Sequence, residues 1–105
     1  MDYITLKSEG KAHIIRIKLL KAVEVSDYLC KFHVKNEKPY SFAESLQKIQ
    51  SILPKHFIRI SRNCVINTQH VKSIDYKRRE VILSGNMIFS FSVRNAKLLK
   101  QMFSR

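Results

Sequence analysis

Two short segments of the chain combine a turn or a helix start with side chains that can form paired hydrogen bonds. Ser61-Arg62-Asn63 interrupts an apolar run, and Ser92-Val93-Arg94-Asn95 precedes an apolar helical pattern. Arginine can donate two parallel hydrogen bonds to O6 and N7 of guanine, and asparagine can pair in a similar way with adenine. Each segment alone also fits a structural role, as a strand turn or as a helix cap. The two segments by themselves therefore leave base recognition and plain turn chemistry open.

The distribution of charge favours base recognition. The 105 residues carry 20 Lys and Arg against 8 Asp and Glu, which gives a formal net charge of +12. Residues 1–54 have nine basic and six acidic side chains, a net charge of +3, whereas residues 55–105 have eleven basic side chains and two acids, a net charge of +9. The excess positive charge lies in the half that contains both segments. Its natural partner is a polyanion such as a nucleic acid.

An anionic membrane could also select for positive charge, but the pattern gives it little support. Membranes usually attract a basic amphipathic helix or a continuous run of Lys and Arg. The longest basic cluster, Lys77-Arg78-Arg79, is expected to form a turn. No apolar run approaches the ~18 residues of a membrane span, and the N-terminus lacks the basic and apolar regions of a signal peptide. We therefore expect a cytoplasmic protein without membrane insertion.

The residue pattern does not indicate an enzyme. The four histidines are scattered without metal-ligand spacing, there is no Gly-rich phosphate loop, and no pair of acids recurs at a spacing suited to one strand face. A Cys–His pair formed only in space stays open. Cys30 and Cys64 lie in apolar contexts and are expected to be two reduced core thiols rather than a disulfide. We therefore expect no catalytic residues, no cofactor and no metal site.

The length and the apolar pattern predict one mostly β domain over residues 1–105. Alternating apolar and polar residues, bounded by turn-forming residues, predict antiparallel strands, with a short extended piece at Tyr40. The expected strands cover residues 4–7, 13–17, 19–25, 29–34, 57–60, 64–66, 71–76, 81–83 and 87–91.

Two segments change to helical spacing. The first begins at Ser41, which forms a capping box with Glu44, and ends before Pro54. The second is capped by Ser92 and closes the chain. The apolar positions expected to face the core are Phe42, Leu46, Ile49 and Leu53 in the first helix, and Leu98, Leu99, Met102 and Phe103 in the second. The sequence thus predicts one short internal helix and one C-terminal helix on a mostly antiparallel β domain.

Several stretches together resemble a known family. The stretch FIRISRNCVINTQHVKSID resembles the central motif of LytTR-type DNA-binding domains, in which a Phe is followed by a strand, a polar triplet and an apolar run ending in Asn. The ending FSFSVRNAKLLKQMF resembles the C-terminal Ser-basic-helix element of that family. The earlier VEVSDYLCKFHV and YSFAESLQKIQSILPKHF resemble its N-terminal strands and internal helix. The resemblance covers nearly the whole chain.

This resemblance implies a fold and a function. The fold would consist of about ten strands in small antiparallel sheets with two helices. The function would be sequence-specific binding of promoter DNA by a bacterial transcription regulator, with loops rather than a helix inserted in the major groove, on paired direct repeats. Arg62 and Arg94 would read bases, and the loop near Asp27–Lys31 would supply a third contact. Asn67 would be structural and would hold the adjoining turn.

The expected interface combines the resemblance with the charge pattern. The base-reading residues are Arg62, Arg94, Asn63 and Asn95. The residues expected to contact phosphates and position the protein are Ser61, Ser92, Lys31, Lys72, Lys77, Arg78, Arg79, Lys97 and Lys100. The loop near Asp27–Lys31 adds Asp27, Tyr28, Leu29 and Cys30 as further DNA contacts.

The chain departs from the family pattern at two positions. Ser61 stands where the family often has His, and Val93 stands where it often has the first of two basic residues. Fewer direct base contacts would mean looser specificity, or a site rich in thymine methyl groups that Val93 could touch. Because family members commonly follow a receiver domain or membrane segments, the chain is expected to be a stand-alone regulator or an output domain trimmed from a receiver or membrane sensor. A second copy on an adjacent repeat is a further expected partner.

Two other functions stay open. The first is an RNA-binding β domain, because single-stranded RNA readers display aromatic side chains for stacking. Tyr28, Tyr40 and Tyr76 are available for this, although they do not form an RNA-binding motif. The second is a basic protein-interaction module that docks an acidic partner. A sequence preference for duplex DNA would separate the first interpretation from both alternatives.

Overall fold

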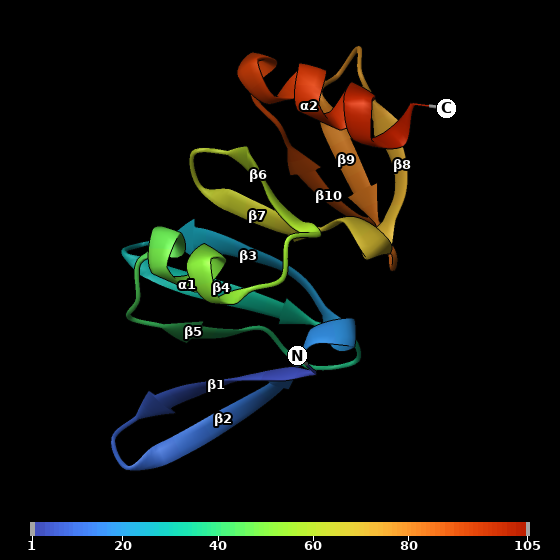
Figure 1. The fold of residues 1–105 in the computed structure, drawn as a ribbon. Coiled ribbons are helices and arrows are strands. Elements are labelled where there is room, and N and C mark those ends of the chain that lie inside the picture. Colours follow the sequence, from blue (N-terminus) through green and yellow to red (C-terminus); the bar gives the residue numbers. More distant parts are fainter. Residues whose placement is uncertain (1, 105) are drawn as a thin grey trace.

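The computed structural model describes residues 2–104, whose strands form three antiparallel sheets (Figure 1). β1 and β2 form a hairpin, the order β5-β4-β3-β7-β6 forms a five-stranded sheet, and β10-β9-β8 forms a three-stranded sheet. The elements are β1 (Tyr3–Ser8), β2 (Lys11–Arg16), η1 (Ile17–Leu19), β3 (Leu20–Ser26), β4 (Leu29–Val34), β5 (Tyr40–Phe42), α1 (Leu46–Ile52), β6 (Phe57–Ser61), β7 (Cys64–Asn67), η2 (Thr68–His70), β8 (Val71–Asp75), β9 (Glu80–Leu83), β10 (Met87–Ser90) and α2 (Val93–Phe103). The predicted fold class is confirmed.

The five-stranded sheet is the middle layer and buries apolar side chains on both faces. On one face, Val23 and Phe32 pack with the β1–β2 hairpin and α1. On the other face, Ala22 and Ile66 pack with the three-stranded sheet and α2. The neighbours Ala22 and Val23 serve different faces because successive side chains of a strand point in opposite directions. Figure 1 shows these layers stacked from the hairpin at the bottom to α2 at the top.

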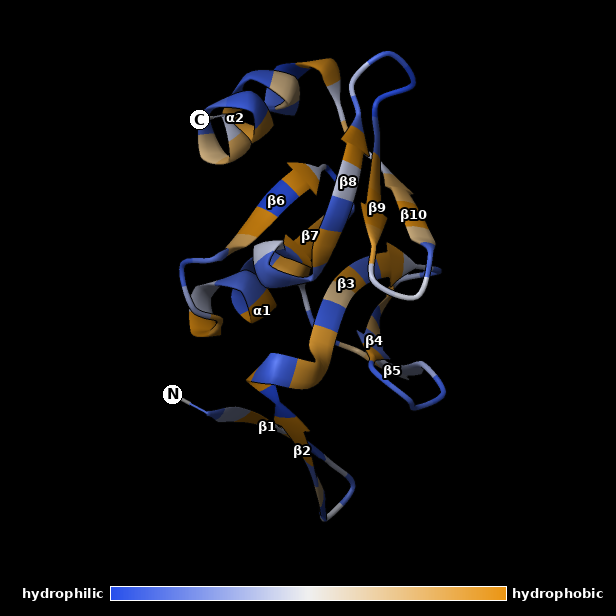
Figure 2. Ribbon diagram, turned by 90° about the vertical axis from the view of Figure 1, so that its right-hand side faces the viewer, coloured by the Kyte–Doolittle hydropathy of each residue, from blue (hydrophilic) through white to orange (hydrophobic). Residues whose placement is uncertain are grey.

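The strands of the five-stranded sheet are consequently held between two packed cores. Figure 2 shows hydrophobic and hydrophilic residues alternating along much of β3 and β6, because successive side chains of a strand point to opposite faces. Neither helix within residues 2–104 has the length and apolar character needed to cross a membrane.

The internal helix begins later than predicted. Ser41 and Phe42 belong to β5, and the helix cap is Ser45, whose Oγ accepts a hydrogen bond from the backbone N–H of Lys48 at 3.1 Å. The Glu44 carboxylate instead accepts from the N–H of Ser45 at 3.1 Å. The predicted capping box at Ser41 is therefore wrong. The antiparallel pairing of β5 with β4 keeps this segment extended and overrides its local helical pattern.

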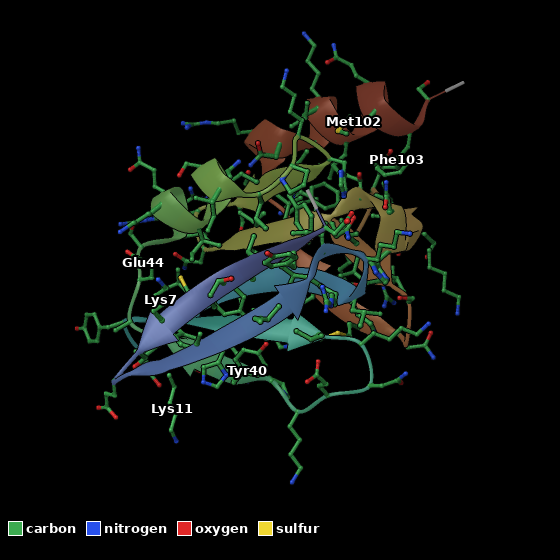
Figure 3. The ribbon with its side chains drawn as sticks, turned by 60° about the horizontal axis from the view of Figure 1, so that its bottom comes forward. Lys7, Lys11, Tyr40, Glu44, Met102 and Phe103 are labelled. Carbon is green, nitrogen blue, oxygen red and sulfur yellow. The ribbon has the colours of Figure 1, made fainter. Side chains whose placement is uncertain are left out.

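The C-terminal helix begins at Ser92, as predicted, but fewer of its apolar residues face the core. Leu99 is fully buried, whereas Leu98, Met102 and Phe103 are 39%, 42% and 40% exposed. The prediction that all four face inward is therefore wrong for three of them. The helix covers one end of the molecule, so only a narrow stripe of it meets the sheet. Figure 3 shows Met102 and Phe103 near its C-terminal end.

The two cysteines lie in different cores. Cys30 packs with the cluster on the hairpin and α1 side, and Cys64 packs with the cluster on the α2 side. Both are buried free thiols, which confirms the predicted reduced core cysteines. Burial, with a smaller contribution from the nearby Glu24 carboxylate, raises the pKa of the Cys64 thiol to about 12. Both thiols are consequently packing groups and stay protonated at neutral pH.

Candidate nucleic-acid interface

Three connecting segments meet at one end of the five-stranded sheet: the β3–β4 turn, the β6–β7 turn and the start of α2. The β3–β4 turn and the β6–β7 turn are neighbours because β3 pairs with both β4 and β7. The N–H of Val25 donates to the carbonyl of Asn63 at 2.8 Å, and the N–H of Ser92 donates to the carbonyl of Ile60 at 2.9 Å. These bonds tie the β6–β7 turn to β3 on one side and to the start of α2 on the other. Figure 1 shows the three segments along the left side of the molecule.

The β6–β7 turn consists of Arg62 and Asn63 between the paired residues Ser61 and Cys64. The register shifts between Arg59 and Ser61, so β6 carries a bulge just before the turn. Bulges commonly re-aim a side chain or end a strand pairing at functional sites. The Ser61 Oγ accepts from the N–H of Asn63 at 3.3 Å, while the Arg62 side chain is exposed. The turn thus presents Arg62 outward and uses Ser61 for its own structure.

The start of α2 presents Arg94 beside this turn. Ser92 Oγ accepts from the N–H of Asn95 at 3.3 Å and from its side-chain amide at 2.8 Å, which confirms the predicted cap. Val93 and Arg94 are exposed, and the first turn contains no acid. Asn95 is half-buried and its amide group serves the cap. Arg94 is therefore the more accessible of the two side chains.

Arg62 and Arg94 share one open hollow on the surface. Its lining residues, all in the described part of the chain, include three arginines and no acid, so the positive potential there is not locally neutralised. The lining consists of Arg59, Ser61, Arg62, Ser92, Val93, Arg94 and Asn95. The structure thus brings together the two segments that the sequence pattern singled out.

Arg59 is the residue of this hollow that the sequence analysis missed. It is half-buried, and its Nε donates to the Ser61 carbonyl at 3.2 Å. Its Nη2 donates to the Arg62 carbonyl at 2.6 Å. A strand pattern alone treats Arg59 as an outward-facing residue. The signal that could have found it is its position three residues before Arg62, within reach of the turn carbonyls.

The β3–β4 turn lies beside the hollow and is fully exposed at its tip. Asp27 and Tyr28 have φ angles of 50° and 70°, and Tyr28 is 98% exposed. Leu29 is 38% exposed. Cys30 is fully buried and its Sγ donates to the Glu44 carbonyl at 2.9 Å, so the prediction that it contacts DNA is wrong. Its side chain points into the core together with those of Phe32 and Val34, because alternate residues of a strand share a face.

Several of the predicted phosphate-contacting residues lie on α2 or in the β8–β9 turn next to its start. Residues 76–79 form a turn, as predicted, and the carbonyl of Arg79 accepts from the N–H of Phe91 at 2.9 Å next to the start of α2. Lys97 and Lys100 are exposed on α2, where the Lys100 ammonium lies 5.4 Å from the Tyr76 ring centroid. Arg79 thus lies next to the start of α2, and the two lysines lie further along the same helix.

Two of the predicted lysines are placed differently. Lys31 is half-buried in β4, opposite Glu24 of β3. Lys72 lies at the other end of the three-stranded sheet, where its Nζ donates to Asn86 Oδ1 at 3.1 Å in the β9–β10 turn. The end of the three-stranded sheet that lies next to α2 is the opposite one, where Glu80 pairs with Ser90. The structure therefore does not bring Lys72 to the three segments.

Asn67 has the predicted structural role. It is fully buried, and its Nδ2 donates to the carbonyl of Leu20 at 2.9 Å. Its Oδ1 accepts from the N–H of Gln69 at 2.9 Å and so caps η2. One side chain thus fixes the crossing from β7 to the three-stranded sheet.

Comparison with known proteins agrees with this arrangement. The sequence model of the LytTr DNA-binding domain matches residues 10–104. A solved structure described as the LytTr DNA-binding domain of a methyl-accepting/DNA response regulator from Bacillus cereus is similar over 100% of this chain and 99% of that chain, with a TM-score of 0.83 and 20% sequence identity. Among curated proteins, none matches the chain. Because the family match spans nearly all of the sequence, the chain belongs to the LytTr DNA-binding domain family, whose members bind DNA in transcription regulation and are not catalytic domains.

Proposed function

We propose that residues 1–105 form one sequence-specific duplex-DNA-binding domain that inserts its three connecting segments in the major groove. The observation that carries this proposal is the shared hollow, in which Arg62 and Arg94 lie together and whose described lining residues include no acid. A groove edge offers guanine O6 and N7 to each guanidinium, and two arginines on one rigid surface can read two base pairs in fixed register.

The side chains of the interface divide into two roles. Arg62 and Arg94 read bases, assisted by Asn63 and Asn95. The hydroxyl groups of Ser61 and Ser92 and the surrounding lysines and arginines contact phosphates, which fix position without carrying sequence information. The positioning set comprises Lys31, Lys77, Arg78, Arg79, Lys97 and Lys100, and the β3–β4 turn adds Asp27, Tyr28 and Leu29.

The wider role is that of a cytoplasmic regulator of bacterial promoters. Two copies bind paired direct repeats, since one copy with two base-reading arginines covers only a short site. The similar Bacillus cereus structure is described as part of a response regulator, which supports a role as the output domain of a two-component system. A receiver or sensor domain is then the natural source of the signal.

The packing of the tyrosines supports duplex DNA over single-stranded RNA. The Tyr40 ring stacks with Phe32 at a centroid distance of 6.3 Å, and the Tyr76 ring meets Phe91 at 6.2 Å. Of the three tyrosines considered for RNA stacking, only Tyr28 is fully exposed. One exposed ring does not make a stacking platform for successive bases.

Selection of binding sites from a random duplex pool at physiological salt tests the proposal. We expect enrichment of a short motif repeated about one helical turn apart, because two copies on one face of DNA require that spacing. Strong binding without an enriched sequence would overturn base reading and leave a general polyanion surface. Preferential competition by single-stranded RNA would favour the RNA-binding alternative.

A further inference from the structure

Arg59 lies underneath the β6–β7 turn and makes more hydrogen bonds to it than any strand role requires. Its Nε and Nη2 donate to the carbonyls of Ser61 and Arg62 at 3.2 Å and 2.6 Å. Its Nη1 is 3.5 Å from Gln50 Oε1, which extends the contact to α1. One planar guanidinium therefore connects two successive carbonyls of the turn with a helix.

The turn needs such support because its backbone is unusual for its length. Two-residue hairpin loops normally use positive φ at one or both central residues, since that conformation matches the twist of the strands. Neither Arg62 nor Asn63 has a positive φ. The bulge between Arg59 and Ser61 adds a further local irregularity. Contacts from outside the turn must consequently fix its shape.

The direction of Arg62 depends on that shape. Its own carbonyl is held by Arg59, so rotation of the peptide beneath it is restrained. Both guanidinium groups line the same hollow, and their like charges disfavour a folded-back Arg62 side chain. The bonds made by Arg59 and the charge it carries thus both favour an outward Arg62.

We propose that Arg59 is the positioning residue that holds Arg62 in its base-reading direction. This inference rests on the proposed function of Arg62 and adds the residue that sets its geometry. Arginine is required because its fork can donate to two carbonyls at once, whereas a lysine ammonium is a compact point charge on a flexible stem. Small errors in the placement of a recognition group are costly because hydrogen bonds weaken steeply with misalignment.

The test compares Arg59→Lys with Arg16→Lys in the full chain. Arg16 is a matched control, because its guanidinium lies over the Tyr3 ring in the β1–β2 hairpin and outside the hollow. Affinities are measured for the selected duplex and for random duplex over a range of salt concentrations. Arg59→Lys should weaken binding to the selected duplex roughly 5- to 150-fold, the range of one bidentate base contact. Its affinity for random duplex and its salt slope should stay unchanged, because the charge is kept.

Combination with Arg62→Ala separates positioning from direct contact. If Arg59 acts through Arg62, Arg59→Lys should have little further effect on base preference when Arg62 is already Ala. Independent, multiplicative losses in the double variant would overturn the inference. An equal loss on selected and random duplex would also overturn it, since that result describes a phosphate contact.

A measurement on the free protein decides the inference without DNA. Amide order parameters at Arg62 and Asn63 should fall below about 0.6 in Arg59→Lys and stay near 0.85 in Arg16→Lys, the typical values for flexible and rigid backbone. Unchanged order in Arg59→Lys would overturn the positioning role even if DNA binding fell. If wild-type protein selected no duplex sequence, the proposed function would fail, and the order parameters would still show whether Arg59 holds the turn.

Discussion

The two hairpin turns at the binding end of the five-stranded sheet have the same length but different means of support. In the β3–β4 turn, Asp27 and Tyr28 both have positive φ, a conformation that suits a two-residue hairpin without help. In the β6–β7 turn, Arg62 and Asn63 lack it and are held by Arg59 and by backbone bonds to neighbouring segments. The first turn is specified locally and the second by tertiary contacts. A recognition residue gains most from the second kind of support, because its geometry is fixed from several sides.

The largest effect on DNA affinity is expected from the loss of a base-reading arginine. Arg94→Ala should weaken binding to the selected duplex by about 1–3 kcal/mol and flatten the preference at one base pair, because a bidentate contact to that base is lost. Competition binding against duplexes changed at single positions measures this. An equal weakening on selected and random DNA would remove Arg94 from the base readers. Arg16→Ala, in the separate hairpin, serves as the control.

The lysines of α2 should act through phosphates instead. Lys97→Ala should weaken all duplex DNA and reduce the slope of log affinity against log salt by about one unit. Lys72→Ala removes the same charge at the far end of the three-stranded sheet, next to Asn86, and should leave the slope unchanged. An unchanged slope in Lys97→Ala would remove Lys97 from the phosphate contacts. An equal reduction in both variants would mean that the interface is not confined to the end with the three segments.

The residue that follows the β6–β7 turn should give the protein a pH-dependent stability. Because the folded-state pKa of Cys64 is raised from 9.0 to about 12, its contribution is complete below pH 9 and is lost as the pH rises toward 12. Between pH 8 and pH 10, the free energy of unfolding should fall by about 1 kcal/mol more in wild-type protein than in Cys64→Ala. Urea unfolding at each pH measures the difference. Parallel pH dependence in the two proteins would contradict the burial of this thiol.

The smallest effects should be changes in stability that differ between the two turns. Tyr28→Gly should raise the free energy of unfolding or leave it unchanged, because glycine adopts a φ of 70° without steric cost. Asn63→Gly should lower it by roughly 0.5–1 kcal/mol, because its φ is not positive and glycine only adds entropy to the unfolded chain. Thermal unfolding of the two variants compares them directly. A loss of stability in Tyr28→Gly as large as in Asn63→Gly would mean that the turns are supported alike.

The sequence predicted those parts of the molecule that depend on local pattern. Strand alternation and turn residues gave the β-rich fold, and the Ser92 cap and the Lys77–Arg79 turn were also found in this way. Where pairing between distant segments decides the outcome, local patterns failed. The Ser41 capping motif does not begin a helix, because the pairing of β5 with β4 keeps this segment extended.

The interface was also predicted only in part, because local patterns do not show which distant residues lie together in the fold. Charge and residue type singled out Arg62 and Arg94, which share a hollow in the fold. Charge alone does not show that Lys72 lies at the opposite end of its sheet. The alternating pattern of β6 predicts only that Arg59 faces outward. Its hydrogen bonds could not be predicted, because the bulge near the turn and the carbonyls that Arg59 reaches exist only in the folded chain.

Amide chemical-shift mapping with the selected duplex tests the central claim most directly. We expect that shifts at Tyr28, Arg62 and Arg94 change on binding and that these changes differ between the selected duplex and a scrambled one. Shifts in the β1–β2 hairpin and near Lys72 should stay close to their free values. Changes centred on the hairpin, or identical changes at the three segments with both duplexes, would contradict the claim that these segments read DNA sequence.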